Sequence, residues 1–158
     1  MGLKIESINF LDIEKQLESL DDPDTMQQVH NTYAKFLDPY VPMDEGVLAH
    51  DVTVTPEYVQ YNSPYAHYMY TGIVYGPNIP IMSNGEIIGY WSPPNQAKHP
   101  TGASIDYSKE KHPLATHHWD KAAMDSQGDV FKSDVKKILQ NKLNPALPGH
   151  LRLLYLRN

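Results

Sequence analysis

The sequence predicts an α+β protein, with helical patterns near both ends and a strand-rich segment between them. From Glu57 to Trp91, apolar and polar residues alternate with a period near two, which is the spacing of β-strands. Apolar residues spaced by three and four predict helices over residues 10–20 and 26–37 before this segment, and over residues 116–143 after it. The length of 158 residues fits one domain. We expect this domain to span residues 1–143 and to be followed by a C-terminal extension, residues 144–158.

Turn and capping signals separate the predicted elements in the N-terminal part of the chain. The pattern from Leu3 to Asn9 is compatible with a short strand, and the acidic turn at residues 21–24 ends the first helix. Asp24 or Thr25 can cap the second helix. Pro39 then ends it, because the residue before a proline is disfavoured in helical conformation.

Strands are expected from Val47 to about Trp91. Residues 65–74 fit either a strand or a short helix, whereas Asn84-Gly85 between two apolar runs predicts a hairpin with a two-residue turn. Residues 93–108 contain three prolines and are expected to form a loop. We expect one sheet, built from about Val52 to Tyr90, to form the scaffold of the domain.

The last helix is expected from Thr116 to Leu143, packed on that sheet. Gly128 weakens its middle by about 1 kcal/mol relative to Ala, which allows a kink or break there. The predicted structural core contains apolar residues of the strands and of this helix: Val52, Val54, Trp119, Phe131, Val135 and Ile138.

Composition narrows the range of functions. The chain has no cysteine, which excludes disulfides and thiolate metal sites. It has no run of 18 apolar residues and no basic leader before an apolar run, so we expect neither a membrane span nor a signal peptide. There is no basic stripe, which disfavours specific nucleic-acid binding.

The net charge of −6 is unevenly distributed. Residues 1–57 contain twelve acidic and three basic residues, whereas residues 58–158 contain seven acidic and ten basic ones. One interpretation is an acidic face that keeps the protein soluble. The other is a dipolar subunit whose electropositive side meets the electronegative side of a neighbour.

Candidate catalytic and metal sites are weak in this sequence. His112, His117 and His118 cluster before the last helix, but their spacing does not match a zinc motif, and adjacent residues on a helix point about 100° apart. A simpler expectation is that one of these histidines packs under Trp119 and that the others are solvated. His67 is expected to be a half-buried strand residue, not a catalytic base. No GxSxG, GxGxxG or GxxxxGK[ST] motif is present. We therefore predict no catalytic activity, no cofactor and no metal.

Tyrosine is concentrated in the strand-rich segment, where six of the eleven tyrosines lie between Tyr58 and Tyr75. Tyrosine suits strands in general, so a sheet is the default explanation. A stacking platform for sugars or bases is the second. The third is a subunit interface, because Tyr and Trp bury a large area while keeping a polar tip. A mixture of sheet and interface accounts best for the pattern.

Four segments, taken in order, resemble the minor capsid proteins of long-tailed bacteriophages and of prophages in Gram-positive bacteria. They are VPMDEGVL at 41–48, VTV at 52–54, VQYNSPYAHYMYTG at 59–72 and HPLATHHWDKA at 112–122. The sequence is most similar to the head–tail joining, or tail-completion, members encoded among the neck genes. The likeness covers residues 25–142. It departs from the family at Glu45, where a Thr is usual, and at Asp51, near a common Ser.

The resemblance implies helices flanking a mostly antiparallel sheet. It also implies a structural virion protein that forms a homo-oligomeric ring, hexameric or dodecameric, at the head–tail interface after assembly in the host cytoplasm. The implied partners are other neck, head-closure and tail proteins. Genome DNA would pass through the lumen without specific binding, and no membrane partner is implied. A net-negative subunit suits such passage.

Contacts between copies are expected from the tyrosine-rich segment, from the loops around residues 77–80 and 92–108, and from the C-terminal extension, residues 144–158. The alternatives are a histidine-based metal protein or enzyme, and a monomeric binding module with an aromatic surface. The predicted interface residues are Tyr65, Tyr68, Tyr70, Pro77, Asn78, Ile79, Trp91, Leu151, Leu153 and Tyr155.

Overall fold

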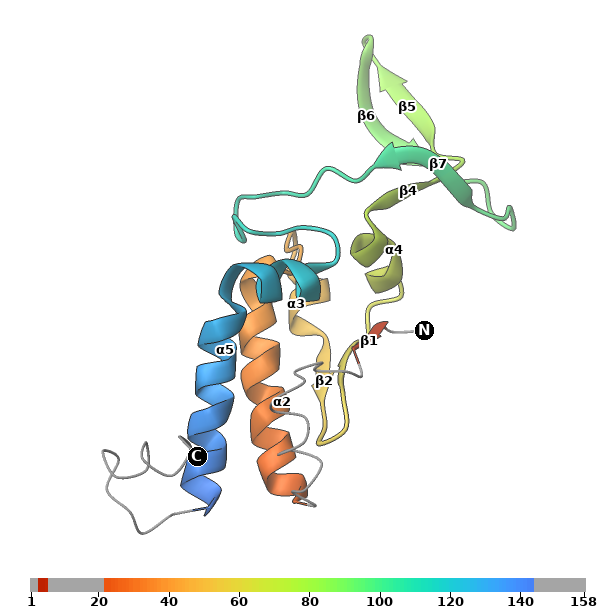
Figure 1. Ribbon diagram of the computed structural model, residues 1–158. Coiled ribbons are helices and arrows are strands. Elements are labelled where there is room, and N and C mark those ends of the chain that lie inside the picture. The colour runs from red at the N-terminus through yellow and green to blue at the C-terminus, as the bar shows by residue number, and fades with distance from the viewer. Residues whose placement is uncertain (1–2, 6–21, 144–158) are drawn as a thin grey trace.

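The computed structural model describes residues 3–5 and 22–143. Figure 1 shows a body of two long helices beside a small sheet, and a group of strands that projects from it. The elements of the body are β1 (Leu3–Ile5), α2 (Pro23–Leu37), η1 (Asp38–Tyr40), α3 (Val47–His50), β2 (Val52–Val54), β3 (Val59–Tyr61), α4 (Ala66–Thr71) and α5 (Trp119–Leu143). The projecting elements are β4 (Ile73–Gly76), β5 (Ile79–Ser83), β6 (Glu86–Trp91) and β7 (His99–Ser104).

The helices α2 and α5 lie side by side and run in opposite directions (Figure 1). Phe131 of α5 is 1% exposed and packs against two rings of α2, with centroid distances of 5.2 Å to Tyr33 and 5.0 Å to Phe36. Such aromatic clusters add to the stabilisation that burial alone provides. Val135 and Leu139 continue the buried stripe one and two turns later, as the helical spacing requires.

An ion pair joins the start of α2 to the end of α5. Pro23 is the first residue of α2 and Asp22 is its N-cap, two to three residues before the predicted cap. The hydroxyl of Thr25 donates a hydrogen bond to the Asp22 carboxylate, and the Lys142 ammonium lies 2.8 Å from the same carboxylate. This ammonium group lowers the pKa of the Asp22 carboxyl.

The body contains a three-stranded antiparallel sheet in the order β1-β3-β2. Tyr61 at the end of β3 faces Leu3 of β1 and Val52 of β2, and its buried ring meets Trp119 edge-on at 5.3 Å. Val52 and Val54 lie on an edge strand and are therefore only partly buried, as is Ile138, although all three pack against the core. Trp119, Phe131 and Val135 are fully buried.

Four local expectations are corrected by the structure. The scaffold is not one sheet, because the strands between residues 52 and 91 belong to three separate antiparallel sheets. Residues 47–50 form a short helix, and residues 99–104 form a strand inside the expected loop. The long helix begins at Trp119, three residues late, because residues 112–118 are tied to other parts of the body. The amide of Thr116 donates to the carbonyl of Tyr40, for instance.

The α+β class, with antiparallel sheets and a long C-terminal helix, is confirmed. The kink or break that Gly128 allows in the last helix occurs at the neighbouring Gln127, where φ is −137° and ψ is 22°. The predicted helix over residues 10–20, the continuation of the first strand to Asn9 and the extension 144–158 lie outside the described residues.

A first prediction tests the helix pair. We expect Phe131→Ala to lower the free energy of unfolding by about 3–5 kcal/mol, because it empties the space between Tyr33 and Phe36. The adjacent Val130 is 58% exposed, so Val130→Ala should change the free energy of unfolding by less than about 0.5 kcal/mol. Urea unfolding of both variants measures the difference, and equal midpoints would contradict the packing described.

A second prediction concerns high pH. Burial raises the pKa of Tyr33 and Tyr61 above the ordinary value of 10.0. Below that pH each group is protonated in both states. Above it the unfolded chain loses the proton and the folded chain keeps it, so stability should fall with rising pH. The slope is up to about 1.4 kcal/mol per pH unit for each tyrosine. Tyr61→Phe should reduce the slope measured by urea unfolding and Tyr90→Phe should not; equal slopes in both variants would be the contrary result.

Candidate functional site

Residues 73–104, which we call the arm, project from the body (Figure 1). The arm contains two antiparallel ribbons, in which β4 pairs with β7 and β5 pairs with β6. At its base the amide of Ile105 donates to the carbonyl of Gly72, at 2.8 Å, so that the chain enters and leaves the arm at one place. The arm is therefore a single projection from one point of the body.

Asn78 holds the two ribbons together. Its side-chain amide donates to the carbonyl of Tyr75 at 2.8 Å. Its side-chain oxygen accepts hydrogen bonds from the Ser92 hydroxyl at 3.1 Å and from the Lys98 ammonium at 3.2 Å. Pro77 and Asn78, both predicted at an interface, are partly buried in this junction and position the hairpin that follows.

The hairpin of β5 and β6 turns at Asn84-Gly85, as predicted. Both residues have positive φ, 51° and 84°, which the primed two-residue turns require. Ile79 lies opposite Trp91, Pro80 opposite Tyr90 and Ile81 opposite Gly89, and an irregularity follows between Ile81 and Met82. Since side chains alternate along a strand, Ile79, Ile81 and Trp91 share one face, and Pro80 and Tyr90 lie on the other.

Both faces of this hairpin are open. Every residue of β5 is exposed, and in β6 only Gly89 is partly covered. The large apolar side chains of the hairpin are 46–67% exposed: Ile79, Ile81, Met82, Ile87, Ile88, Tyr90 and Trp91. An antiparallel sheet normally packs one face on a core, so this hairpin carries apolar surface that its own chain does not bury in the described structure.

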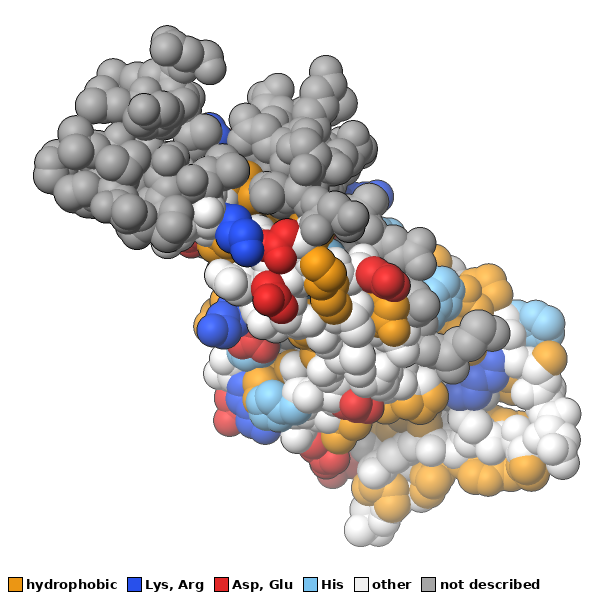
Figure 2. All heavy atoms as spheres, turned by 90° about the horizontal axis from the view of Figure 1, so that it is seen from below, with side chains coloured by type: hydrophobic (Ala, Val, Ile, Leu, Met, Phe, Trp, Pro, Cys, Tyr) orange, Lys and Arg blue, Asp and Glu red, His pale blue; other side chains and the backbone are white. Residues whose placement is uncertain are grey.

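The arm is also nearly uncharged. Between Gly72 and Ser104 the sequence contains one acidic residue, Glu86, one basic residue, Lys98, and a single histidine, His99. Figure 2 shows a group of hydrophobic side chains among uncharged ones at the lower right of the molecule. A surface depleted of charge and rich in Ile, Met, Tyr and Trp has the composition of an interface core.

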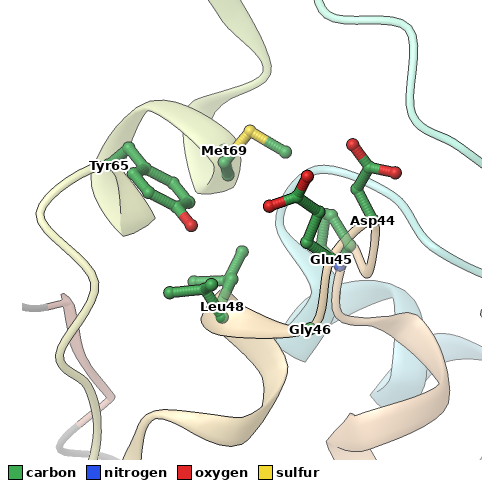
Figure 3. A pocket seen from close by; sticks show the side chains of 8 residues that line it. Asp44, Glu45, Gly46, Leu48, Tyr65 and Met69 are labelled. Atoms are coloured by element: carbon green, nitrogen blue, oxygen red, sulfur yellow. The ribbon is translucent and has the colours of Figure 1, made fainter.

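The body has a hollow beside the base of the arm, which we call the notch. Its volume is about 270 Å³. Figure 3 shows Tyr65, the residue before α4, and Met69 of α4 facing Leu48 of α3, with the Glu45 carboxylate directed toward the space between them. The residues that line the notch are Pro42, Asp44, Glu45, Gly46, Val47, Leu48, Tyr65 and Met69. A second hollow of about 290 Å³ lies along α2 and β2, next to Lys35 and Asp38.

The notch combines apolar walls with unpaired acids. Val47 and Tyr65 are exposed large apolar residues. The ammonium of Lys111 donates to the main-chain carbonyl of Asp44. Neither the Asp44 nor the Glu45 carboxylate has an ion-pair partner within the part of the chain that the structure describes.

The predicted interface tyrosines have three different environments. Tyr65 lines the notch. Tyr68 is exposed and packs its ring on Tyr75 of the arm, at 4.8 Å. Tyr70 is partly buried, because its hydroxyl donates to Asp120 at 2.9 Å and its ring meets Trp119 at 5.0 Å. Tyr70 therefore holds α4 on α5, and Leu151, Leu153 and Tyr155 lie outside the described residues.

The sequence reasoning named only the two ends of the hairpin surface, Ile79 and Trp91. It placed the other exposed apolar residues of the hairpin in the scaffold sheet. A signal was present, because β6 reads EIIGYW, with consecutive apolar residues that alternation does not explain. Such a run in a short hairpin indicates that both faces are apolar.

His112, His117 and His118 make local contacts. Nδ1 of His112 lies 2.8 Å from the carbonyl of Val41, and Nδ1 of His117 lies 2.9 Å from Nδ1 of His118. His118 packs against Tyr70, and His67 is exposed on α4, not half-buried in a strand. Among the described residues, no group of three His, Asp or Glu side chains is arranged to hold a metal ion.

Comparisons with protein-family models, with curated proteins and with solved structures found no match to this chain. Within residues 3–5 and 22–143, no helix is both long and apolar enough to cross a membrane.

A third prediction uses the two tryptophans, of which one is buried in the body and the other is exposed on the arm. Trp119 is fully buried and Trp91 is 50% exposed. We expect the fluorescence of the dilute protein to contain a red-shifted component that acrylamide quenches readily, and we expect Trp91→Phe to remove it. Tyr90→Phe, on the same strand, is the control. Emission from the wild type that is fully protected from acrylamide would show that the arm is covered within one chain.

Proposed function

We propose that this chain is a structural assembly protein: a subunit of a ring in the neck of a tailed bacteriophage, where the DNA-filled head joins the tail. The observation that carries the assembly role is the hairpin of β5 and β6, whose seven large apolar side chains are 46–67% exposed. The sequence resemblance to head–tail joining proteins supplies the setting in the virion.

The hairpin has the physical character of an element that is completed by a partner. A two-stranded hairpin alone is marginally stable in water. Exposed apolar patches beyond a few hundred Å² are rare on monomeric proteins and mark interaction sites. Burying side chains such as Ile88 and Tyr90 against another protein removes apolar surface from water and orders the hairpin at the same time.

The distribution of charge is consistent with repeated contact between copies. The excess of acids lies in residues 1–57, and the excess of bases lies in residues 58–158. If these excesses lie on two different surfaces of one subunit, they favour head-to-tail contact, which closes into a ring when the rotation between copies permits. The hexameric or dodecameric copy number and the virion location remain part of the proposal.

A fourth prediction changes the arm without changing the contacts within the chain. Gly89 lies opposite Ile81, and a Cβ placed there would meet nothing within 4 Å. Gly89→Asp should therefore fold normally. An unpaired carboxylate in an apolar interface costs several kcal/mol, so we expect association to weaken at least about 100-fold. Ser133→Asp on the exposed side of α5 adds the same charge and should assemble like the wild type.

Light scattering and electron microscopy of both variants measure assembly, and thermal unfolding checks the fold. Tailed particles produced by a strain that encodes this chain should contain it, and an antibody against it should label the junction of head and tail. Particles that lack the chain would overturn the virion role. Normal assembly of the Gly89→Asp protein would overturn the role of the arm.

A further inference from the structure

We propose that the arm of one copy docks in the notch of the next copy, and that this contact links the subunits of the assembly. The inference rests on the proposed function, because it names the contact through which that assembly forms. It assigns the two sides of the contact to different parts of the chain: the Ile79, Ile81 and Trp91 face of the hairpin, and the hollow between residues 42–48 and α4.

The first argument is the size of the unburied surface. The hairpin has seven large apolar side chains that are about half exposed. Only three of them, Ile79, Ile81 and Trp91, lie on the face that docks. Counting about 100 Å² for each, this face would remove on the order of 300 Å² from water, less than half of the roughly 800 Å² that one partner contributes to a standard interface. The docked face therefore supplies the apolar centre of the contact, and the contact needs further surface around it.

The second argument is the fit of the hollow. An apolar cavity of about 150 Å³ holds a benzene molecule, so a space of about 270 Å³ admits an indole ring or two aliphatic side chains. Trp91 and Ile79 lie opposite each other at the root of the hairpin and supply such a pair. The walls of the notch offer them Leu48, Tyr65 and Met69.

The third argument is charge. Lys98, the one cation of the arm, is held by Asn78 beside the same end of the hairpin. The notch carries the Asp44 and Glu45 carboxylates, which have no ion-pair partner in the described part of the chain. Seating Trp91 in the notch brings opposite charges together at its rim, where they favour this register over others.

The arrangement of the subunit makes the contact intermolecular. The arm projects away from α3 and α4, which line the notch (Figure 1). The ribbon of β4 and β7 stands between the base of the arm and the hairpin, so the hairpin of one copy does not fold back into its own notch. Donor and acceptor surfaces that lie apart on one subunit produce a head-to-tail contact.

A lipid bilayer is a less suitable partner for the hairpin than a protein. The tip consists of Ser83, Asn84, Gly85 and Glu86, and inserting these polar groups and this charge into hydrocarbon is unfavourable. A pocket with carboxylates at its rim and apolar walls satisfies both the apolar faces and the nearby ammonium. The observations therefore favour a second copy of this chain.

Cysteine cross-linking tests the contact directly, because the chain has no cysteine of its own. Ile81→Cys marks the arm and Val47→Cys marks the notch. The two purified variants are mixed at high concentration and treated with a short bismaleimide. We expect a cross-linked dimer in the mixture and at least tenfold less in either variant alone. Val130→Cys replaces the notch variant in the matched control and should give no product, because Val130 is 58% exposed, against 51% for Val47, but lies on α5.

The outcomes separate this inference from the proposed function. Assembled material with the mass of a multimer, but without the cross-link between positions 81 and 47, overturns the contact and leaves the assembly role intact. If Val47→Cys is cross-linked to Leu153→Cys and not to Ile81→Cys, the C-terminal extension occupies the notch, which also overturns the contact. Sedimentation of the wild type with phosphatidylglycerol vesicles, abolished by Gly89→Asp, identifies the arm as a lipid anchor and overturns the contact. A protein that stays monomeric and gives no cross-link refutes docking between copies.

Discussion

The packing around Trp119 determines where the arm is placed. Its ring is fully buried and meets Tyr61 of the sheet and Tyr70 of α4 edge-on, at 5.3 Å and 5.0 Å. The residues on either side of it hold the same helix: the amide of His118 donates to the carbonyl of Tyr70, and Asp120 accepts from the Tyr70 hydroxyl. Helix α4 leads directly into β4, so a loss of this cluster would release the base of the arm from the body.

The close approach at Gly72 defines the turn at the base of the arm. Gly72 has a φ of 74°, and a Cβ there would lie 2.8 Å from the Cβ of His117. Only glycine permits both the left-handed conformation and this distance. The chain therefore turns sharply from α4 into the arm, while Tyr107 reaches back to donate to the carbonyl of Met69. A projection fixed at its base loses less conformational entropy on docking than a flexible loop would.

Local signals predicted the two long helices of the described residues and the hairpin, and non-local pairing limited the rest. The Asn84-Gly85 hairpin and the stripe of Phe131 and Val135 follow from turn chemistry and helical spacing. The division of the strands into three sheets depends on which strands meet, which periodicity does not encode. The exposed hairpin was misread for the same reason: a run such as Glu86–Trp91 is equally compatible with a buried strand until the absence of a covering element is known.

An apolar hairpin with open edges also carries a risk of non-specific strand pairing, and its sequence contains features that oppose it. Pro80 removes one backbone donor from β5, the irregularity after Ile81 disturbs the register, and Glu86 places a charge beside the turn. These are the devices by which natural edge strands avoid aggregation. The backbone of the hairpin is thus protected while its side chains remain available, which favours recognition by a shaped and charged pocket over pairing of one edge with another. In the docking we propose, such a pocket would fix one register between copies, and the rotation between copies would decide whether the contacts close into a ring.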